Sequence, residues 1–169
     1  MINNIIFDFD GVLVDSEILV ARSFTKYLND SGFSFDEREF SKFAGLKTFQ
    51  VINILTEKFS IKNKKIFYNE IMDIASNIYI NELETVKGAY EFVKNTNLNL
   101  FIGSNSVKPR ILEGLKKVKL DKYISPNNIY SFDMVNNPKP FPDIYLKVID
   151  DNNLNKKETI IIEDSSVGV

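Results

Sequence analysis

The chain has 169 residues, of which 44% are hydrophobic and 26% are charged, and its formal net charge is −2. This composition is typical of a globular protein and lacks the excess of positive charge expected of a nucleic-acid-binding protein. The absence of cysteine and histidine excludes disulfides, thiol catalysis, imidazole bases and metal sites built on sulfur or imidazole. Any bound metal must therefore have oxygen ligands, which favours Mg²⁺, Ca²⁺ or Mn²⁺.

The N-terminus does not have the pattern of a secretion signal. It lacks a basic start, and Asp8 and Asp10 interrupt its apolar run. No apolar stretch of the sequence approaches the roughly 20 residues that a membrane-spanning helix needs. These features predict a cytoplasmic protein that has neither a membrane nor a nucleic acid as a partner.

Three short apolar runs end abruptly in polar residues. They cover residues 5–10, 98–105 and 159–164, and a weaker run lies near residues 128–131. Continuous runs of β-branched and aromatic residues predict strands that are buried on both faces, as in a parallel sheet. Because ligands bind outside the carboxyl ends of the strands in open α/β sheets, we expect the polar endings to meet at one site.

Segments with helical spacing alternate with these runs. Apolar residues recur at intervals of three and four after Pro109 and after Pro142, and a shorter pattern covers residues 89–93. Strands that alternate with helices predict right-handed crossovers and an α/β fold with a Rossmann-like parallel sheet. The two longer helices have as their apolar residues Ile111, Leu112, Leu115 and Val118, and Ile144, Tyr145, Val148 and Ile149.

Residues 17–87 form a connection that is too long for a single crossover helix. Their apolar residues recur at helical spacing in three separate groups. We therefore predict an all-helical insertion, residues 17–87, within a core domain made of residues 1–16 and 88–169. Its position directly after the first strand makes it a candidate cap over the site.

Asp8 and Asp10 lie two residues apart at the end of the first strand, so their side chains leave on the same side. Two carboxylates this close repel each other unless a cation neutralises the pair. A divalent metal would do so and would leave one carboxylate free as a nucleophile. Gly11 then allows a tight turn. The alternative is a polar strand end with two solvated acids.

Three further elements lie at strand ends or before helices. Glu163 and Asp164 could supply more oxygen ligands, or they could belong to a helix cap. The hydroxyl of Ser104, in a Gly-Ser-Asn-Ser sequence, suits a phosphate oxygen, or it could be a simple N-cap. Prolines on both sides of Lys139 restrict the backbone, so that its ammonium could neutralise a phosphoryl group. Alternatively, Lys139 is an exposed lysine in a rigid loop.

In this order, these elements resemble the four motifs of the haloacid dehalogenase superfamily. The segment Asp8-Phe-Asp-Gly-Val-Leu-Val-Asp-Ser16 and the Lys-Pro-x-Pro-Asp-Ile of residues 139–144 resemble its β-phosphoglucomutase-like subgroup in particular. The resemblance covers nearly the whole chain, including the helical insertion. It implies a Mg²⁺-dependent phosphatase whose substrate is a small phosphorylated metabolite, such as a sugar phosphate or a sugar-acid phosphate.

The resemblance also implies roles for individual residues. Asp8 would attack phosphorus and form an aspartyl-phosphate, and Asp10 would protonate the leaving alkoxide and then activate water. Ser104 would hydrogen-bond the phosphoryl oxygens, Lys139 would balance the negative charge, and Asn105 would be a further substrate contact. This division of labour agrees with the physics of phosphoryl transfer, which needs positioning and charge neutralisation above all.

The metal site implied by the resemblance has four contributors. Asp164 would hold Mg²⁺ directly, Asp8 would be a further ligand, Asp10 would touch the metal through its backbone carbonyl, and Glu163 would assist, directly or through water. A haloacid dehalogenase is the weaker reading, because that reaction does not use a metal.

In the insertion, the segment from Phe43 to Thr48 resembles the loop that reads the substrate in this subgroup. Gly45 fits the family position, and Lys47 is the predicted substrate contact. The family's basic residue can also align one place later, with Thr48. A solvated lysine is the alternative for Lys47.

Two features depart from the family pattern. The mutase of the family carries a histidine early in its cap, near the position of Val20 here, and this chain has none. We therefore expect a phosphatase, with a phosphosugar mutase as the enzymatic alternative. The family also continues beyond the Glu-Asp motif, whereas this sequence stops at Val169. From this we expect a truncated core with residues 159–162 at an exposed edge, in a monomer or in an association through that edge. An inactive protein that keeps the fold is the other alternative.

Overall fold

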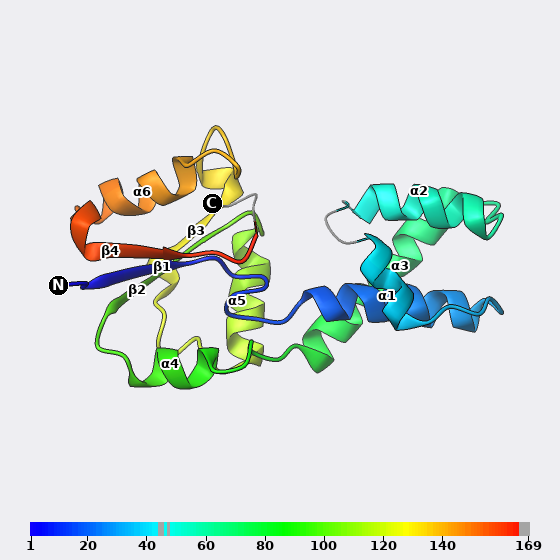
Figure 1. The fold of residues 1–169 in the computed structure, drawn as a ribbon, viewed down its shortest axis with the longest axis horizontal. Helices are drawn as coiled ribbons and strands as arrows, with labels where there is room; N and C mark the ends of the chain where they lie inside the picture. Colours follow the sequence, from blue (N-terminus) through cyan, green and yellow to red (C-terminus); the bar gives the residue numbers. More distant parts are fainter. Residues whose placement is uncertain (44–45, 47, 166–169) are drawn as a thin grey trace. The chain divides into compact units, whose positions relative to one another are not determined.

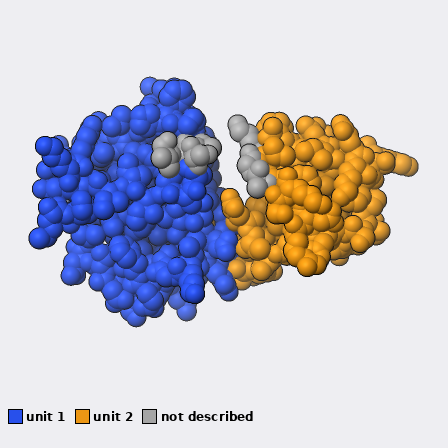
Figure 2. Space-filling view, in the orientation of Figure 1, with its two compact units in different colours: residues 1–16, 83–169 blue, residues 17–82 orange. Residues whose placement is uncertain are grey.

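The computed structural model describes residues 1–43, 46 and 48–165. The chain divides into two compact units, of which unit 1 comprises residues 1–16 and 83–169 and unit 2 comprises residues 17–82 (Figure 2). Each unit has its own hydrophobic core and is described by itself.

Over its described residues, unit 1 forms a four-stranded parallel sheet (Figure 1). The strands are β1 (Asn4–Phe7), β2 (Asn99–Ser104), β3 (Ile129–Ser131) and β4 (Thr159–Ile162), in the order β3-β2-β1-β4. In register, Ile5 of β1 lies between Leu100 of β2 and Ile160 of β4. The predicted parallel α/β sheet is therefore confirmed, and its order places β1 between the two strands that carry the other polar endings.

Helices cover both faces of this sheet (Figure 1). Successive residues of β1 point to opposite faces. Ile6 belongs to the core cluster that α6 (Asp143–Asp151) covers, while the Phe7 ring meets Phe92 of α4 (Ala89–Asn95), with 6.2 Å between centroids. The remaining helices of the unit are α5 (Lys108–Lys117) and the 3-10 helices η2 (Pro126–Asn128), η3 (Phe132–Met134) and η4 (Lys156–Glu158).

Gly103 of β2 allows α6 to lie close to the sheet. A Cβ at this position would be 2.8 Å from Ile144 Cγ2 and 3.2 Å from the Tyr145 ring. Such a separation is shorter than carbon atoms in contact adopt, so a larger residue would push the helix away. The close approach brings the first turn of α6 next to the ends of the strands.

β4 is less covered than the other strands of the sheet. Ile160 and Ile161 are 42% and 43% exposed, whereas β1 is buried throughout. A groove of about 690 Å³ lies between α6 and β4, and among the described strands β4 pairs only with β1. The prediction of burial on both faces is thus confirmed for β1, whereas β4 is, over the described residues, the exposed edge expected from the sequence for residues 159–162.

Unit 2 is helical. Its elements are α1 (Glu17–Asp30), η1 (Glu37–Phe43), α2 (Thr48–Lys58) and α3 (Lys64–Glu82). Their apolar faces meet in a cluster that contains Phe24, Leu55 and Phe67, and the Phe24 and Phe67 rings pack edge to face. Among the described residues of the chain, we find no helix with the length and apolarity needed to cross a membrane.

The compact helical unit ends at Glu82, five residues before the predicted end of the insertion at residue 87. Thr85 forms an isolated antiparallel bridge with Val14, and the Val86 N–H donates to the Leu13 carbonyl over 3.2 Å. These backbone bonds tie the returning chain to the segment that follows β1.

Candidate active site

The polar endings of β1, β2 and β4 meet at the carboxyl edge of the sheet. Asp8 directly follows β1, and its N–H donates to the Ile162 carbonyl at the end of β4 over 2.9 Å. Ser104 is the last residue of β2 and is buried, with 2% exposure. The convergence expected from the sequence is confirmed for these three strand ends.

Lys139 lies at the centre of the site. Its Nζ is 3.0 Å from Asp8 Oδ1 and 2.7 Å from Glu163 Oε2. The side chains of Lys139 and Glu163 are each 4% exposed, and that of Asp8 is 13% exposed. Lys139 is therefore a buried ammonium shared by two carboxylates, and the alternative of an exposed loop lysine is wrong.

The side chain of Asn105 holds the backbone of Lys139. Asn105 Nδ2 donates to the Lys139 carbonyl over 3.2 Å, and Asn105 Oδ1 accepts from the Lys139 N–H over 3.1 Å. Both polar atoms of the amide are thus engaged with the lysine loop. The sequence predicted Asn105 as a substrate contact, and the structure instead joins its side chain to Lys139.

Glu163 is surrounded by hydrogen-bond donors. Its Oε2 accepts from Lys139 Nζ and from the Tyr145 hydroxyl over 2.5 Å, and its Oε1 accepts from Ser165 Oγ over 2.8 Å. Burial disfavours the charged form, but these hydrogen bonds outweigh it and hold the pKa of Glu163 at about 2. Glu163 is therefore ionised at neutral pH.

For Asp8, the effect of burial on the pKa outweighs the effect of its charged and hydrogen-bonding partners. Burial raises the pKa of its carboxyl from the ordinary 3.8 to about 6, although the charge and hydrogen bond of Lys139 act to lower it. The neighbouring charge of Glu163 adds to the rise. The site thus holds Asp8 as a carboxylate that lacks full neutralisation by the protein itself.

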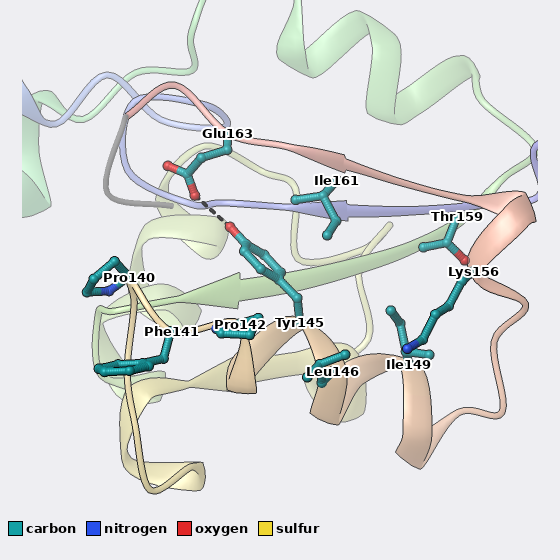
Figure 3. A pocket seen from close by; sticks show the side chains of 10 residues that line it. All are labelled: Pro140, Phe141, Pro142, Tyr145, Leu146, Ile149, Lys156, Thr159, Ile161 and Glu163. Carbon is teal, nitrogen blue, oxygen red and sulfur yellow. Dashed lines mark hydrogen bonds between the residues drawn. The ribbon is translucent and has the colours of Figure 1, made fainter. Parts of the chain in front are cut away.

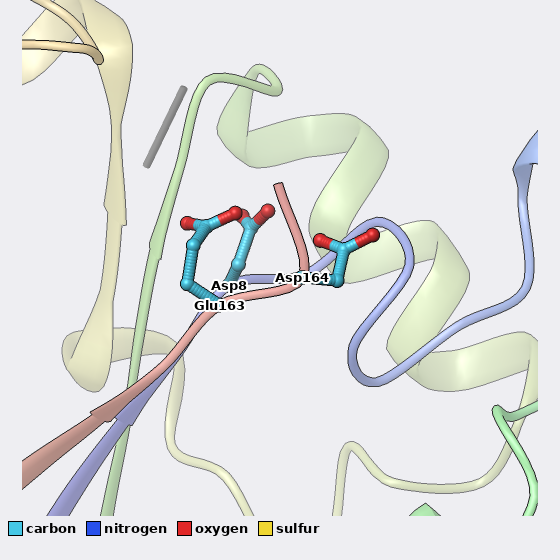
Figure 4. Close-up of side chains that lie close together, drawn as sticks. All are labelled: Asp8, Glu163 and Asp164. Atoms are coloured by element: carbon cyan, nitrogen blue, oxygen red, sulfur yellow. The ribbon is translucent and has the colours of Figure 1, made fainter. Parts of the chain in front are cut away.

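A cation would supply the missing neutralisation. Asp8, Glu163 and Asp164 each offer one carboxylate oxygen, and these oxygens lie within 4.8 Å of one another (Figure 4). Lys139 brings one positive charge against three carboxylates. An all-oxygen donor set fits Mg²⁺, which prefers carboxylates and water. The predicted ligands Asp8, Glu163 and Asp164 are thus close enough to share one ion.

Gly11 is required where Asp164 approaches the first loop. Its φ is +81°, and a Cβ there would lie 2.1 Å from Asp164 Oδ2. The positive φ agrees with the tight turn expected at Gly11. The missing side chain also leaves the space that the Asp164 carboxylate occupies.

The carboxylate of Asp10 lies apart from this group of three. Ser16 Oγ donates to its Oδ1 over 2.5 Å, and Ser106 Oγ donates to its Oδ2 over 2.6 Å. Arg110 Nη2 lies 3.5 Å from Oδ1. Over the described residues, the Asp10 side chain is not part of the three-carboxylate group, which leaves its backbone carbonyl as the predicted metal contact.

The hydroxyl of Ser104 does not cap a helix. Its Oγ accepts from the Ser106 N–H over 3.0 Å, whereas α5 begins at Lys108 with Val107 at its N-cap position and no side-chain cap bond. The N-cap alternative for Ser104 is therefore wrong. Gly45 and Lys47, the predicted substrate contacts of the insertion, lie outside the described residues.

Several residues of the site were not predicted from the sequence. Tyr145 was assigned only to the apolar face of a helix, and its hydroxyl instead reaches Glu163. Ser16 ends the Asp8–Ser16 segment, and the sequence pattern indicates no role for its hydroxyl. Ser106 and Arg110 follow the second strand, and a polar cluster at that strand end was the signal available for them.

A parallel sheet with a buried lysine and three acids at its carboxyl edge defines a site suited to phosphoryl transfer with a divalent cation. The family described as haloacid dehalogenase-like hydrolase matches residues 5–169, and the chain belongs to it. The chain is 31% identical to a phosphorylated carbohydrates phosphatase of Thermotoga maritima, covering 98% of this chain and 77% of that protein. It is 24% identical to the 6-phosphogluconate phosphatase of Escherichia coli K12, covering 99% and 76% respectively.

Solved structures agree with this family. A putative β-phosphoglucomutase from Thermotoga maritima superposes with a TM-score of 0.85 at 28% identity, covering 99% of this chain and 78% of that chain. A conserved haloacid dehalogenase-like protein from Agrobacterium tumefaciens gives a TM-score of 0.82 at the same identity, covering 99% and 77%. The resemblance to the β-phosphoglucomutase-like subgroup is therefore confirmed.

Proposed function

We propose that this chain is a Mg²⁺-dependent phosphatase that hydrolyses a small phosphorylated metabolite, a sugar or sugar-acid phosphate, through an aspartyl-phosphate on Asp8. The observation that carries the proposal is the position of Asp8, which lies at once beside a buried ammonium and within a group of three carboxylates. The substrate class is supported by relatives named for phosphorylated carbohydrates and 6-phosphogluconate.

The first half of the reaction forms the intermediate. A carboxylate oxygen of Asp8 attacks phosphorus, the bond from phosphorus to the ester oxygen breaks, and Asp10 gives its proton to that oxygen. Lys139 neutralises charge on Asp8 and on the phosphoryl oxygens, and the Ser104 hydroxyl donates to one of those oxygens. Mg²⁺, held by Asp8, Glu163, Asp164 and the Asp10 carbonyl, would supply further positive charge beside the phosphoryl group.

The second half regenerates the enzyme. Asp10, now ionised, removes a proton from water, and the resulting oxygen forms a bond to phosphorus while the bond to Asp8 breaks. Phosphate leaves and the Asp8 carboxylate is restored. The hydroxyls of Ser16 and Ser106 contact both oxygens of Asp10, so they can orient this carboxyl group in either protonation state.

Hydrolysis of p-nitrophenyl phosphate tests the proposal. We expect turnover with Mg²⁺, loss of turnover in EDTA, and no turnover in Asp8→Asn, whose fold should persist because the side chain keeps its shape. Asp150→Asn, an exposed change on α6, is the matched control and should retain full activity. Near-normal activity of Asp8→Asn, or full activity in EDTA, would contradict the mechanism. Isomerisation of a sugar phosphate without phosphate release would favour the mutase instead.

We further propose that unit 2 acts as a cap that selects the substrate. The proposal is supported by its insertion directly after the loop that carries Asp10 and Ser16. Bound substrate should slow hydrogen exchange in residues 43–48, because a closing cap excludes water. Unchanged exchange there under saturating substrate would contradict this role.

A further inference from the structure

We infer that Tyr145 is a positioning residue of the site, and that its hydroxyl increases the affinity of the protein for Mg²⁺ by fixing Glu163 and Lys139. The inference rests on the proposed function, because it concerns the same carboxylate group. Tyr145 touches none of the reacting atoms, so its effect reaches the reaction through its two neighbours.

Tyr145 contacts both neighbours from the first turn of α6. Its hydroxyl lies 2.5 Å from Glu163 Oε2 (Figure 3), and the centre of its ring lies 4.8 Å from Lys139 Nζ. The residue is 5% exposed, and its ring packs where Gly103 of β2 has no side chain. A buried, close-packed ring has little freedom to turn, so the direction of the hydroxyl is fixed.

The hydroxyl completes the set of donors to Glu163. Lys139 and Tyr145 donate to Oε2, while the hydroxyl and the N–H of Ser165 donate to Oε1 over 2.8 and 3.3 Å. A carboxylate has about four lone-pair positions for such bonds. The four donors therefore fix the rotation of the carboxylate, and the longest of these bonds, from the Ser165 N–H over 3.3 Å, is the one that a metal or a metal-bound water would replace.

Lys139 depends on the same contact. Its ammonium is shared between Glu163 and Asp8, at 2.7 and 3.0 Å. When Tyr145 also donates to Glu163 Oε2, Lys139 need not neutralise that oxygen alone and can remain close to Asp8. Removal of the hydroxyl would draw the ammonium toward Glu163 and leave Asp8 less well placed.

A second buried tyrosine in the same core provides a matched control. Tyr130 is also 5% exposed and belongs to the same cluster under α6, but its hydroxyl oxygen accepts a hydrogen bond from Asn152 Nδ2 over 2.9 Å and does not contact the carboxylates. Tyr145→Phe and Tyr130→Phe each remove one hydroxyl and keep the ring. A purely structural role would give both changes the same effects.

The experiment measures Mg²⁺ binding without turnover, by isothermal titration of the wild type and both variants. Tyr145→Phe should weaken binding roughly 10- to 100-fold, the usual loss when a group that orients a metal ligand is removed. Tyr130→Phe should bind like the wild type. With p-nitrophenyl phosphate at saturating Mg²⁺, Tyr145→Phe should lower kcat more than it raises KM.

The same change made in the Glu163→Gln variant tests whether the hydroxyl acts through Glu163 or through a general loss of structure. In Glu163→Gln the hydroxyl has no charged partner, so adding Tyr145→Phe should change Mg²⁺ affinity by less than about twofold. Equal losses in both backgrounds, or wild-type affinity in Tyr145→Phe, would overturn the inference while leaving the proposed function intact. A wild-type chain that neither binds Mg²⁺ nor hydrolyses phosphate esters would overturn the proposed function and this inference with it.

Discussion

Replacement of Asp8 by asparagine should stabilise the metal-free protein at neutral pH while it abolishes activity. Asp8 is 13% exposed, and its pKa is raised mainly by burial to about 6. A carboxyl group whose pKa is higher in the folded state than in the unfolded state favours folding while it is protonated. That stability is lost as the pH rises from the unfolded pKa through the folded pKa. At neutral pH the ionised Asp8 therefore destabilises the metal-free fold.

The size of the effect follows from the pKa. A rise from 3.8 to about 6 corresponds to about 3 kcal/mol of unfolding free energy, at about 1.4 kcal/mol for each pKa unit. Asparagine has the shape of the acid but no charge, so Asp8→Asn should recover most of this energy at about pH 7.5. At about pH 4 the difference should fall below about 1 kcal/mol, because the wild-type group is then protonated in the folded state.

Urea denaturation in EDTA at these two pH values measures the unfolding free energies of the wild type and Asp8→Asn and so tests the prediction. Addition of Mg²⁺ at the higher pH should then stabilise the wild type more than Asp8→Asn, because the variant has lost one of the three carboxylates. Equal stability of the two proteins at the higher pH, or a difference of the same size at both pH values, would refute the view that an incompletely neutralised Asp8 destabilises the apo site.

Two other substitutions test the residues that position Asp164 and Lys139. Gly11→Ala should cost about 1 to 2 kcal/mol of stability, because φ is +81°, and should weaken Mg²⁺ binding, because the new Cβ would displace Asp164. Thermal unfolding and a Mg²⁺ titration measure the two effects, and wild-type binding would show that Asp164 does not need this space. Asn105→Ala should cost about 1 to 2 kcal/mol by removing two hydrogen bonds to the Lys139 backbone, and should lower kcat more than it raises KM. A selective rise in KM would instead support Asn105 as a substrate contact.

Much of this architecture could be predicted from local patterns. The apolar runs around Ile5, Leu100 and Ile160 identify strands because β-branched and aromatic residues rarely form such runs elsewhere. Parallel pairing brings the strand ends to one edge of the sheet, and the observed pairing of β1 with β4 then places Asp8 beside Glu163. Residue patterns therefore predicted that the polar endings converge, and the family resemblance implied that Asp8, Glu163 and Asp164 act together.

Side-chain contacts between residues far apart in the sequence could not be predicted from local patterns. Asn105 meets Lys139 across 34 residues, and neither residue carries a pattern that indicates the other. Tyr145 has the spacing of a core residue, and only the direction of its hydroxyl distinguishes it from one. The apolar run around Ile161 does not itself indicate exposure, because the same residue type suits a central strand and an edge; the exposed edge was expected only from comparison with the longer family pattern.

The backbone bonds beside the junction of the units have a consequence for how the chain can be rearranged. The Asp15 N–H donates to the Glu84 carbonyl over 3.0 Å, and Val14 forms an antiparallel bridge with Thr85. The segment that leads into unit 2 and the segment that leads out of it therefore lie side by side. Residues 17–82 are therefore attached to the sheet domain by two adjacent, hydrogen-bonded segments. We expect that a segment attached in this way can be exchanged for another helical module, or for a short turn, without changing the register of the sheet. With the cap role proposed for unit 2, substrate choice and chemical machinery would reside in separately replaceable parts of one polypeptide.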